Sequence, residues 1–244
     1  MEAQARIFDR QLLWISIFAI SMAFFESAIV VYIRALYYPE GFTFPLTQIE
    51  PHIGITEILR EFFSLVMILS VAALTTRNFL RRFAHFLYIF ALWDIFYYIF
   101  LKLLLGWPES LLTWDVLFLI PVTWSGPVIT PVIVSMVMLL FALVIRHFHG
   151  RAGYQFYLEP REWVVLLAGA VVIFFSFIWD YTRFLITHID RQILNDQSRL
   201  REQLEEIAYR YVPQDFNWLL YGAGIILLLI SLVMIYRRNQ KIWR

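Results

Sequence analysis

Six long apolar runs set the pattern of hydrophobic and polar positions along this chain. Each is close to the roughly 20 residues that a helix needs to cross the hydrocarbon core of a bilayer. The pattern predicts an all-α integral membrane bundle of six transmembrane helices, which forms one polytopic domain over residues 1–244. The first run continues past Glu26 for two turns, which favours a retained anchor over a cleaved signal peptide. The predicted spans are Leu12–Ile33, Ile53–Thr75, Phe83–Leu105, Val128–Ile145, Trp163–Thr187 and Trp218–Tyr236.

The basic residues of the connections predict the orientation of the bundle. Connections 38–52 and 106–115 contain no Lys or Arg, whereas the tails and the alternate connections are rich in them. Because Lys and Arg gather in cytoplasmic loops, both termini are predicted to be cytoplasmic, in a plasma (inner) membrane. The basic residues concerned are Arg6, Arg10, Arg77, Arg81, Arg82, Arg146, Arg151, Arg161, Arg237, Arg238, Lys241 and Arg244.

Composition agrees with a membrane protein and excludes several kinds of chemistry. Hydrophobic residues make up 61% of the chain and charged residues only 16%, with a mean hydropathy of +0.67. The chain has no cysteine, so it forms no disulfide, thiolate metal site or cysteine nucleophile of its own. A net charge of +1 gives no indication of a nucleic-acid partner.

Ionisable residues inside the predicted spans are the main functional signal. In the second span, Glu57, Arg60 and Glu61 fall within an arc of about 100° on a helix. Charges near the bilayer centre cost several kcal/mol unless they face one another or water. All those of the spans lie in the outer half or at the midplane, which predicts one polar pocket open to the extracytoplasmic side. The set comprises five acids and four bases: Glu26, Glu57, Glu61, Asp94, Asp180, Arg34, Arg60, Lys102 and Arg183.

Part of this set has a simpler interpretation. Arg34, Lys102 and Arg183 are close enough to the outer interface for their long side chains to reach it. Glu57 lies one turn into its span, where a carboxylate stabilises a helix N-terminus. The short carboxylate side chains of Glu26, Glu61 and Asp94 have no such alternative.

The fourth segment carries an irregularity at the same depth. Residues Val116–Ile145 form 30 uncharged positions, too many for one upright span and too few for two. They contain Pro121, Pro127 and Pro131, and proline interrupts the hydrogen bonds of a helix. We expect a short lead-in, a break around Trp124–Gly126 and a helix starting near Pro127, with an ordinary proline-kinked span as the alternative.

Aromatic residues surround the predicted pocket. Trp93, Tyr97, Tyr98 and Trp124 are assigned to a site for a flat or amphiphilic molecule, and Trp179 is also deep enough to wall it, although membrane proteins also place aromatic residues at the interfaces. The sequence identifies no cofactor, and no histidine pattern typical of a metal site is present. Carboxylates could ligate a hard cation, but Arg60 among them favours ion pairs, so no metal is predicted.

The connection 188–216 is the only sizeable segment outside the spans. Apolar residues recur along one face of a predicted extracytoplasmic amphipathic helix of about 20 residues that ends before Pro213. Packing against the spans is the simplest interpretation. A lid over the pocket and a docking site for a partner are the alternatives.

Three functions stay open at this level. The first is binding of an amphiphilic small molecule, lipid-like or quinone-like, by a protein whose partners are membrane lipids. The second is a non-catalytic subunit assembled with other membrane subunits. The third is an intramembrane enzyme that uses the carboxylates as acid–base groups or metal ligands.

Overall fold

The computed structural model describes residues 2–149, 156–190 and 196–241 and contains seven helices and two short strands in that part of the chain. Six helices are long and apolar enough to cross a membrane, which confirms the predicted number of spans. They are α1 (Glu2–Tyr37), α2 (Pro51–Thr75), α3 (Phe79–Leu105), α4 (Ile129–His149), α5 (Pro160–His188) and α7 (Trp218–Lys241).

Helix boundaries follow local sequence signals. Helices α2 and α5 both begin with proline, which has no backbone N–H to leave unsatisfied at a first helical position. Helix α3 begins after Asn78, whose side chain accepts a hydrogen bond from the Arg81 backbone N–H, and ends at Gly106 with φ of 67°. That left-handed conformation favours glycine and ends a helix.

The fourth segment differs from the prediction. Strands β1 (Trp114–Phe118) and β2 (Trp124–Pro127) pair antiparallel, with Asp115 opposite Gly126. Helix α4 begins only at Ile129, as a separate helix, so the predicted broken or kinked helix is not confirmed and the class is not purely α. Proline interrupts the hydrogen bonds of a helix and leaves neighbouring backbone groups without partners. In a hairpin, backbone groups form hydrogen bonds between the two strands instead.

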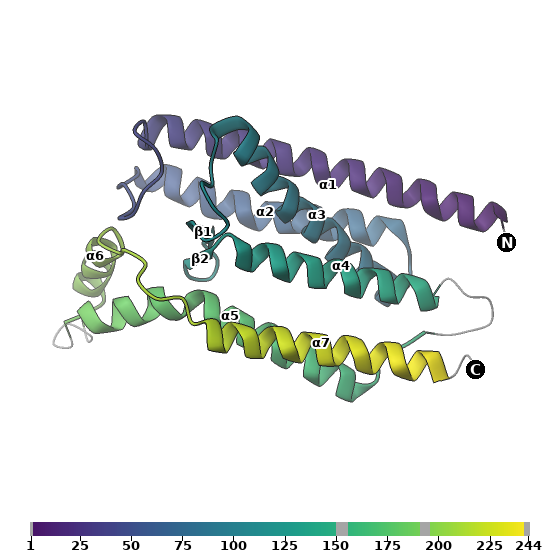
Figure 1. Cartoon of the computed structure of the whole chain (residues 1–244). Helices are drawn as coiled ribbons and strands as arrows, with labels where there is room; N and C mark the ends of the chain where they lie inside the picture. The colour runs from purple at the N-terminus through teal and green to yellow at the C-terminus, as the bar shows by residue number, and fades with distance from the viewer. Residues whose placement is uncertain (1, 150–155, 191–195, 242–244) are drawn as a thin grey trace.

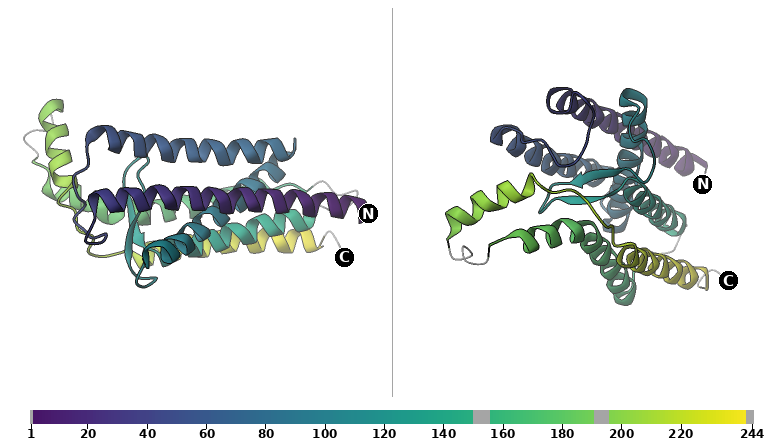
Figure 2. Two further views of the ribbon diagram at one scale, coloured as in Figure 1. Left: turned by 90° about the horizontal axis from the view of Figure 1, so that it is seen from above. Right: turned by 60° about the vertical axis from the view of Figure 1, so that its left-hand side comes forward.

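The helices form two packed groups (Figure 1). One hydrophobic cluster joins α1, α2 and α3 through residues such as Ile15, Ile68 and Ile89. The other joins α3, α4, α5 and α7 through residues such as Phe141 and Ile173. Both termini lie at one end of the bundle; we call the opposite end, made of residues 38–50, the hairpin and the short helix α6, the hairpin end. The hairpin lies between the α1–α3 group and α5 (Figure 2).

In its described residues, connection 188–216 contains one short helix, α6 (Gln197–Ala208). Asp196 caps α6 and accepts hydrogen bonds from the backbone N–H groups of Ser198 and Arg199. At 12 residues, α6 is shorter than the predicted helix of about 20. Residues 191–195 of that prediction lie outside the described part of the chain. The extracytoplasmic position of α6 stays a prediction.

Helices α5 and α7 cross closely at Gly169 of α5 and Gly224 of α7. A Cβ atom added at Gly224 would lie 2.6 Å from Cγ1 of Ile173 and 3.0 Å from its backbone N, whereas one added at Gly222 meets nothing within 4 Å. We expect Gly224→Ala to lower the free energy of unfolding by about 1–3 kcal/mol, because the helices must separate. Gly222→Ala is the matched control, and thermal unfolding in detergent measures both. Equal effects of the two substitutions would contradict this packing.

Candidate functional site

A cavity of about 890 Å³ lies inside the bundle and is bordered by the hairpin. Its walls come from α1, α2, α3, α4, α5, α7, the hairpin, residues 38–50 and the end of α6. The structure brings together ten of the thirteen residues that the sequence assigned to the pocket. They are Glu26, Arg34, Glu57, Arg60, Glu61, Trp93, Asp94, Tyr97, Tyr98 and Trp124.

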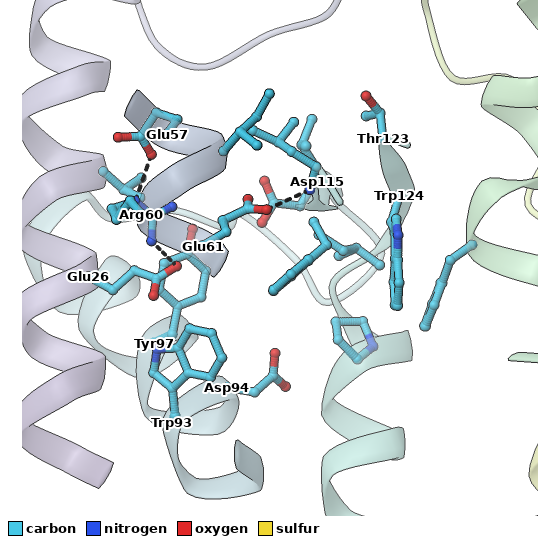
Figure 3. A pocket seen from close by; sticks show the side chains of 18 of the residues that line it. Glu26, Glu57, Arg60, Glu61, Trp93, Asp94, Tyr97, Asp115, Thr123 and Trp124 are labelled. Atoms are coloured by element: carbon cyan, nitrogen blue, oxygen red, sulfur yellow. Dashed lines mark hydrogen bonds and ion pairs between the residues drawn. The ribbon is translucent and has the colours of Figure 1, made fainter. Parts of the chain in front are cut away.

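Arg60 is the centre of the charged end of the cavity (Figure 3). Its Nε donates to Oε2 of Glu57 at 2.8 Å, and its Nη1 lies 3.0 Å from Oε1 of Glu26. The two glutamates come from different helices, α2 and α1, and all three side chains are at least 83% buried. The triad therefore joins α1 to α2 where α1 and α2 carry their predicted intramembrane charges.

A second buried ion pair closes the cavity toward the hairpin end. Nη2 of Arg34 lies 3.6 Å from Oδ1 of Asp115, while the guanidinium group lies 3.8 Å from the ring centroid of Trp107. The hydroxyl of Tyr98 donates to Oδ2 of Asp115 at 3.2 Å. Burial raises the pKa of Asp115 to about 6, and the charge of Arg34 acts in the opposite direction.

Asp115 was not predicted as a site residue, because it lies at the end of connection 106–115, outside the predicted spans. The available signal was its position immediately before the apolar run VLFLI. A carboxylate at the start of such a run is only 3% exposed here because strand β1 turns it inward, opposite Gly126.

Glu61 and Asp94 also face the cavity but have neutral partners. Oε2 of Glu61 accepts a hydrogen bond from the backbone N–H of Leu119 at 2.9 Å. Oδ2 of Asp94 accepts one from the hydroxyl of Ser135 at 2.8 Å. Within the described ranges, neither carboxylate lies within 4.0 Å of a basic nitrogen.

The rest of the cavity is apolar and largely aromatic. Trp124 packs edge-on against Phe174 and stacks on Phe177, with ring centroids 5.1 and 5.8 Å apart. Beyond it, a part that we call the apolar limb extends toward the terminal end between α3, α4 and α5. Its walls include Phe86, Phe90, Met138, Phe141, Leu167 and Ala170.

Three predicted site residues do not line the cavity. Nζ of Lys102 donates to the carbonyl oxygens of Gly106 and Pro108, at 2.9 and 2.8 Å, and so stabilises the end of α3. Asp180 accepts hydrogen bonds from the hydroxyl of Tyr211 at 2.8 Å and from the backbone N–H of Gln214 at 3.2 Å. Arg183 is exposed. A binding role for these three remains an untested prediction.

Tyr211 ties the segment after α6 to the cavity wall. Its hydroxyl lies 2.7 Å from Oγ of Ser125 in β2 and donates to Asp180 of α5. Burial raises the pKa of Tyr211 well above its ordinary value, so the hydroxyl keeps its proton for this donation. Tyr211 therefore fixes the segment after α6 against both the hairpin and α5.

Neither a metal-binding group nor a similar known protein helps to identify the function of the cavity. Within residues 2–149, 156–190 and 196–241, no group of three or more His, Asp or Glu side chains is arranged to hold a metal ion. Comparison of the chain with protein-family models, curated proteins and solved structures finds no match in any of the three.

Proposed function

We propose that this multi-pass membrane protein binds one amphiphilic small molecule, lipid-like or quinone-like, in the cavity. The observation that carries the proposal is the union of a charged end and an apolar limb in one cavity of about 890 Å³. Pockets for small molecules usually measure roughly 300–1,000 Å³ and combine apolar walls with a few convergent polar groups. A molecule with a polar head and an apolar chain matches that division.

The position of the cavity supports access from the bilayer. Leu167 and Ala170 of α5 line the apolar limb and are also exposed, so the limb is not sealed at this part of α5. On this proposal, a ligand dissolved in the membrane enters the limb sideways, without crossing water.

The orientation of the bundle in the membrane is part of the same proposal. With cytoplasmic termini in a plasma (inner) membrane, the hairpin end is extracytoplasmic and the charged end of the cavity lies in the outer half of the bilayer. Helix α6 then covers the cavity from outside, since Glu205 and Ala208 of α6 line the cavity, as does Tyr209, which follows α6 directly.

Filling the apolar limb tests this function. We expect Met138→Trp to reduce a co-purified small-molecule adduct at least tenfold, because the larger side chain occupies the space of the ligand chain. Met136→Trp is the matched control: Met136 is also on α4 but is 58% exposed and lies outside the lining. Native mass spectrometry of both variants, extracted in lipid nanodiscs, measures the adduct.

Comparison of the two variants shows whether the adduct is bound in the cavity. Loss of the adduct in Met138→Trp alone supports binding in the cavity. An equal adduct in both variants, or a wild-type chain that carries none, contradicts it.

A further inference from the structure

Arg34 is held at the wall of the cavity by aromatic rings rather than by hydrogen bonds. Its guanidinium group lies 3.8 Å from the ring centroid of Trp107 and 4.5 Å from that of Phe42, and the planes of these two rings are 83° apart. Arg34 lines the cavity and is only 8% exposed, so its guanidinium group is not simply solvated at the surface. The ring contacts stabilise its charge, but they supply no oxygen acceptor for its five N–H donors.

The guanidinium group of Arg34 has a counter-charge but no hydrogen-bond partner. Its Nη2 lies 3.6 Å from Oδ1 of Asp115, which is an ion-pair distance but exceeds the range of about 2.7–3.2 Å for an N–H···O hydrogen bond. Asp115 accepts a hydrogen bond from the hydroxyl of Tyr98 instead. Within the described ranges, none of the three side-chain nitrogens of Arg34 donates a hydrogen bond.

The other arginine of the lining differs in this respect. Arg60 donates from Nε to Oε2 of Glu57 at 2.8 Å, and its Nη1 lies 3.0 Å from Oε1 of Glu26. Buried N–H donors nearly always have an acceptor, which is a protein group or a bound molecule. The free donors of Arg34 therefore indicate that an oxygen atom of a ligand belongs beside this guanidinium group.

Charge decides which kind of acceptor fits. Asp115 already offsets the charge of Arg34, and more carboxylates than guanidinium groups line the cavity. An anionic head beside Asp115 would add repulsion, and a protonated amine offers Arg34 a like charge and no acceptor. A neutral carbonyl oxygen supplies the acceptor without adding a charge.

We propose that the ligand carries a neutral carbonyl group whose oxygen accepts hydrogen bonds from the guanidinium group of Arg34, with its chain in the apolar limb. Quinones and esters share this chemistry. The planar guanidinium group is already held by Phe42 and Trp107, so it loses little freedom when it binds. This inference rests on the proposed function and narrows it from amphiphiles in general to those with a carbonyl group.

Four probes with similar chains and different heads test the proposal. They are 2-decyl-1,4-benzoquinone, methyl dodecanoate, dodecanoate and dodecylamine, each added in equal amount to the wild-type protein. Nanodiscs of ether-linked lipids are used, because ester-linked lipids would themselves offer carbonyl groups. Native mass spectrometry counts the bound molecules. We expect at least one of the two carbonyl probes to bind at least tenfold more tightly than dodecanoate and dodecylamine, a difference of about 1.4 kcal/mol.

A double variant tests the role of Arg34 without leaving a buried charge alone. In Arg34→Met/Asp115→Asn, we expect the preference for the carbonyl probe to fall below twofold. Arg210→Met/Glu206→Gln is the matched control and should keep the wild-type preference. It also removes both charges of an ion pair, but both side chains are exposed and lie outside the lining.

The results separate failure of this inference from failure of the proposed function. Equal binding of the four probes, or tightest binding of dodecanoate or dodecylamine, overturns the carbonyl head while leaving the amphiphile site intact. An unchanged preference in Arg34→Met/Asp115→Asn also overturns it, because water would then satisfy Arg34. Binding of no probe, or binding that Met138→Trp does not reduce, contradicts the proposed function itself. The first comparison uses only the wild-type chain, so it holds even if the double variant fails to fold.

Discussion

Replacing Arg60 with methionine is expected to lower the free energy of unfolding by about 3–5 kcal/mol. The guanidinium group is the counter-charge of both Glu26 and Glu57, and removal of one partner from a buried ion pair leaves an uncompensated charge. Methionine keeps most of the length of the side chain, so the loss reflects charge more than packing. Chemical denaturation in detergent measures the change.

Two further variants separate this effect from a general intolerance of substitution. Arg210, which follows α6, pairs with Glu206 of α6, but the Arg210 side chain is 72% exposed. Arg210→Met should therefore cost less than about 1 kcal/mol. The triple variant Arg60→Met/Glu26→Gln/Glu57→Gln should recover most of the lost stability, because it removes all three charges together. A triple variant less stable than Arg60→Met would show that the charges are not what matters.

Glu162→Ala is expected to cost about 3 kcal/mol at the terminal end of the bundle. The Glu162 carboxylate accepts hydrogen bonds from Nε and Nη2 of Arg238 at 2.8 and 3.0 Å and from the backbone N–H of Glu159 at 2.8 Å. It therefore joins α5 to α7 and caps the start of α5, although its side chain is only 1% exposed.

Glu206→Ala is the control for Glu162→Ala, because it breaks the exposed pair with Arg210. The coupling between Glu162 and Arg238 follows from the double variant Glu162→Ala/Arg238→Ala in a thermodynamic cycle. A coupling energy of about 1 kcal/mol or more is expected. A coupling near zero would mean that the two side chains stabilise the helices independently.

The spans could be predicted from sequence because each carries its own signal. A run of some 20 apolar residues satisfies its backbone in lipid only as a helix, so length and composition alone are sufficient. The inward direction of Glu57, Arg60 and Glu61 followed from the cost of exposing charges to lipid. These residues do lie on one wall of the cavity.

The hairpin and the pairing of charges could not be predicted in this way. Prolines at 121, 127 and 131 showed that a helix would be interrupted, but the strands depend on pairing across the chain, which no local pattern specifies. Likewise, Asp180 and Arg183 lie at a suitable depth on α5, yet Asp180 bonds to Tyr211 instead. Depth along a helix is readable from sequence, whereas the rotation of α5 relative to α3 depends on packing.

The most direct measurement of the central claim is an experimental structure of the protein in lipid nanodiscs, determined by electron cryo-microscopy without added ligand. Binding of an amphiphile predicts elongated non-protein density that runs from the charged end of the cavity into the apolar limb beside Phe86 and Phe141. A bundle in which α5 packs directly against α3, with the limb closed and no such density, would contradict the account.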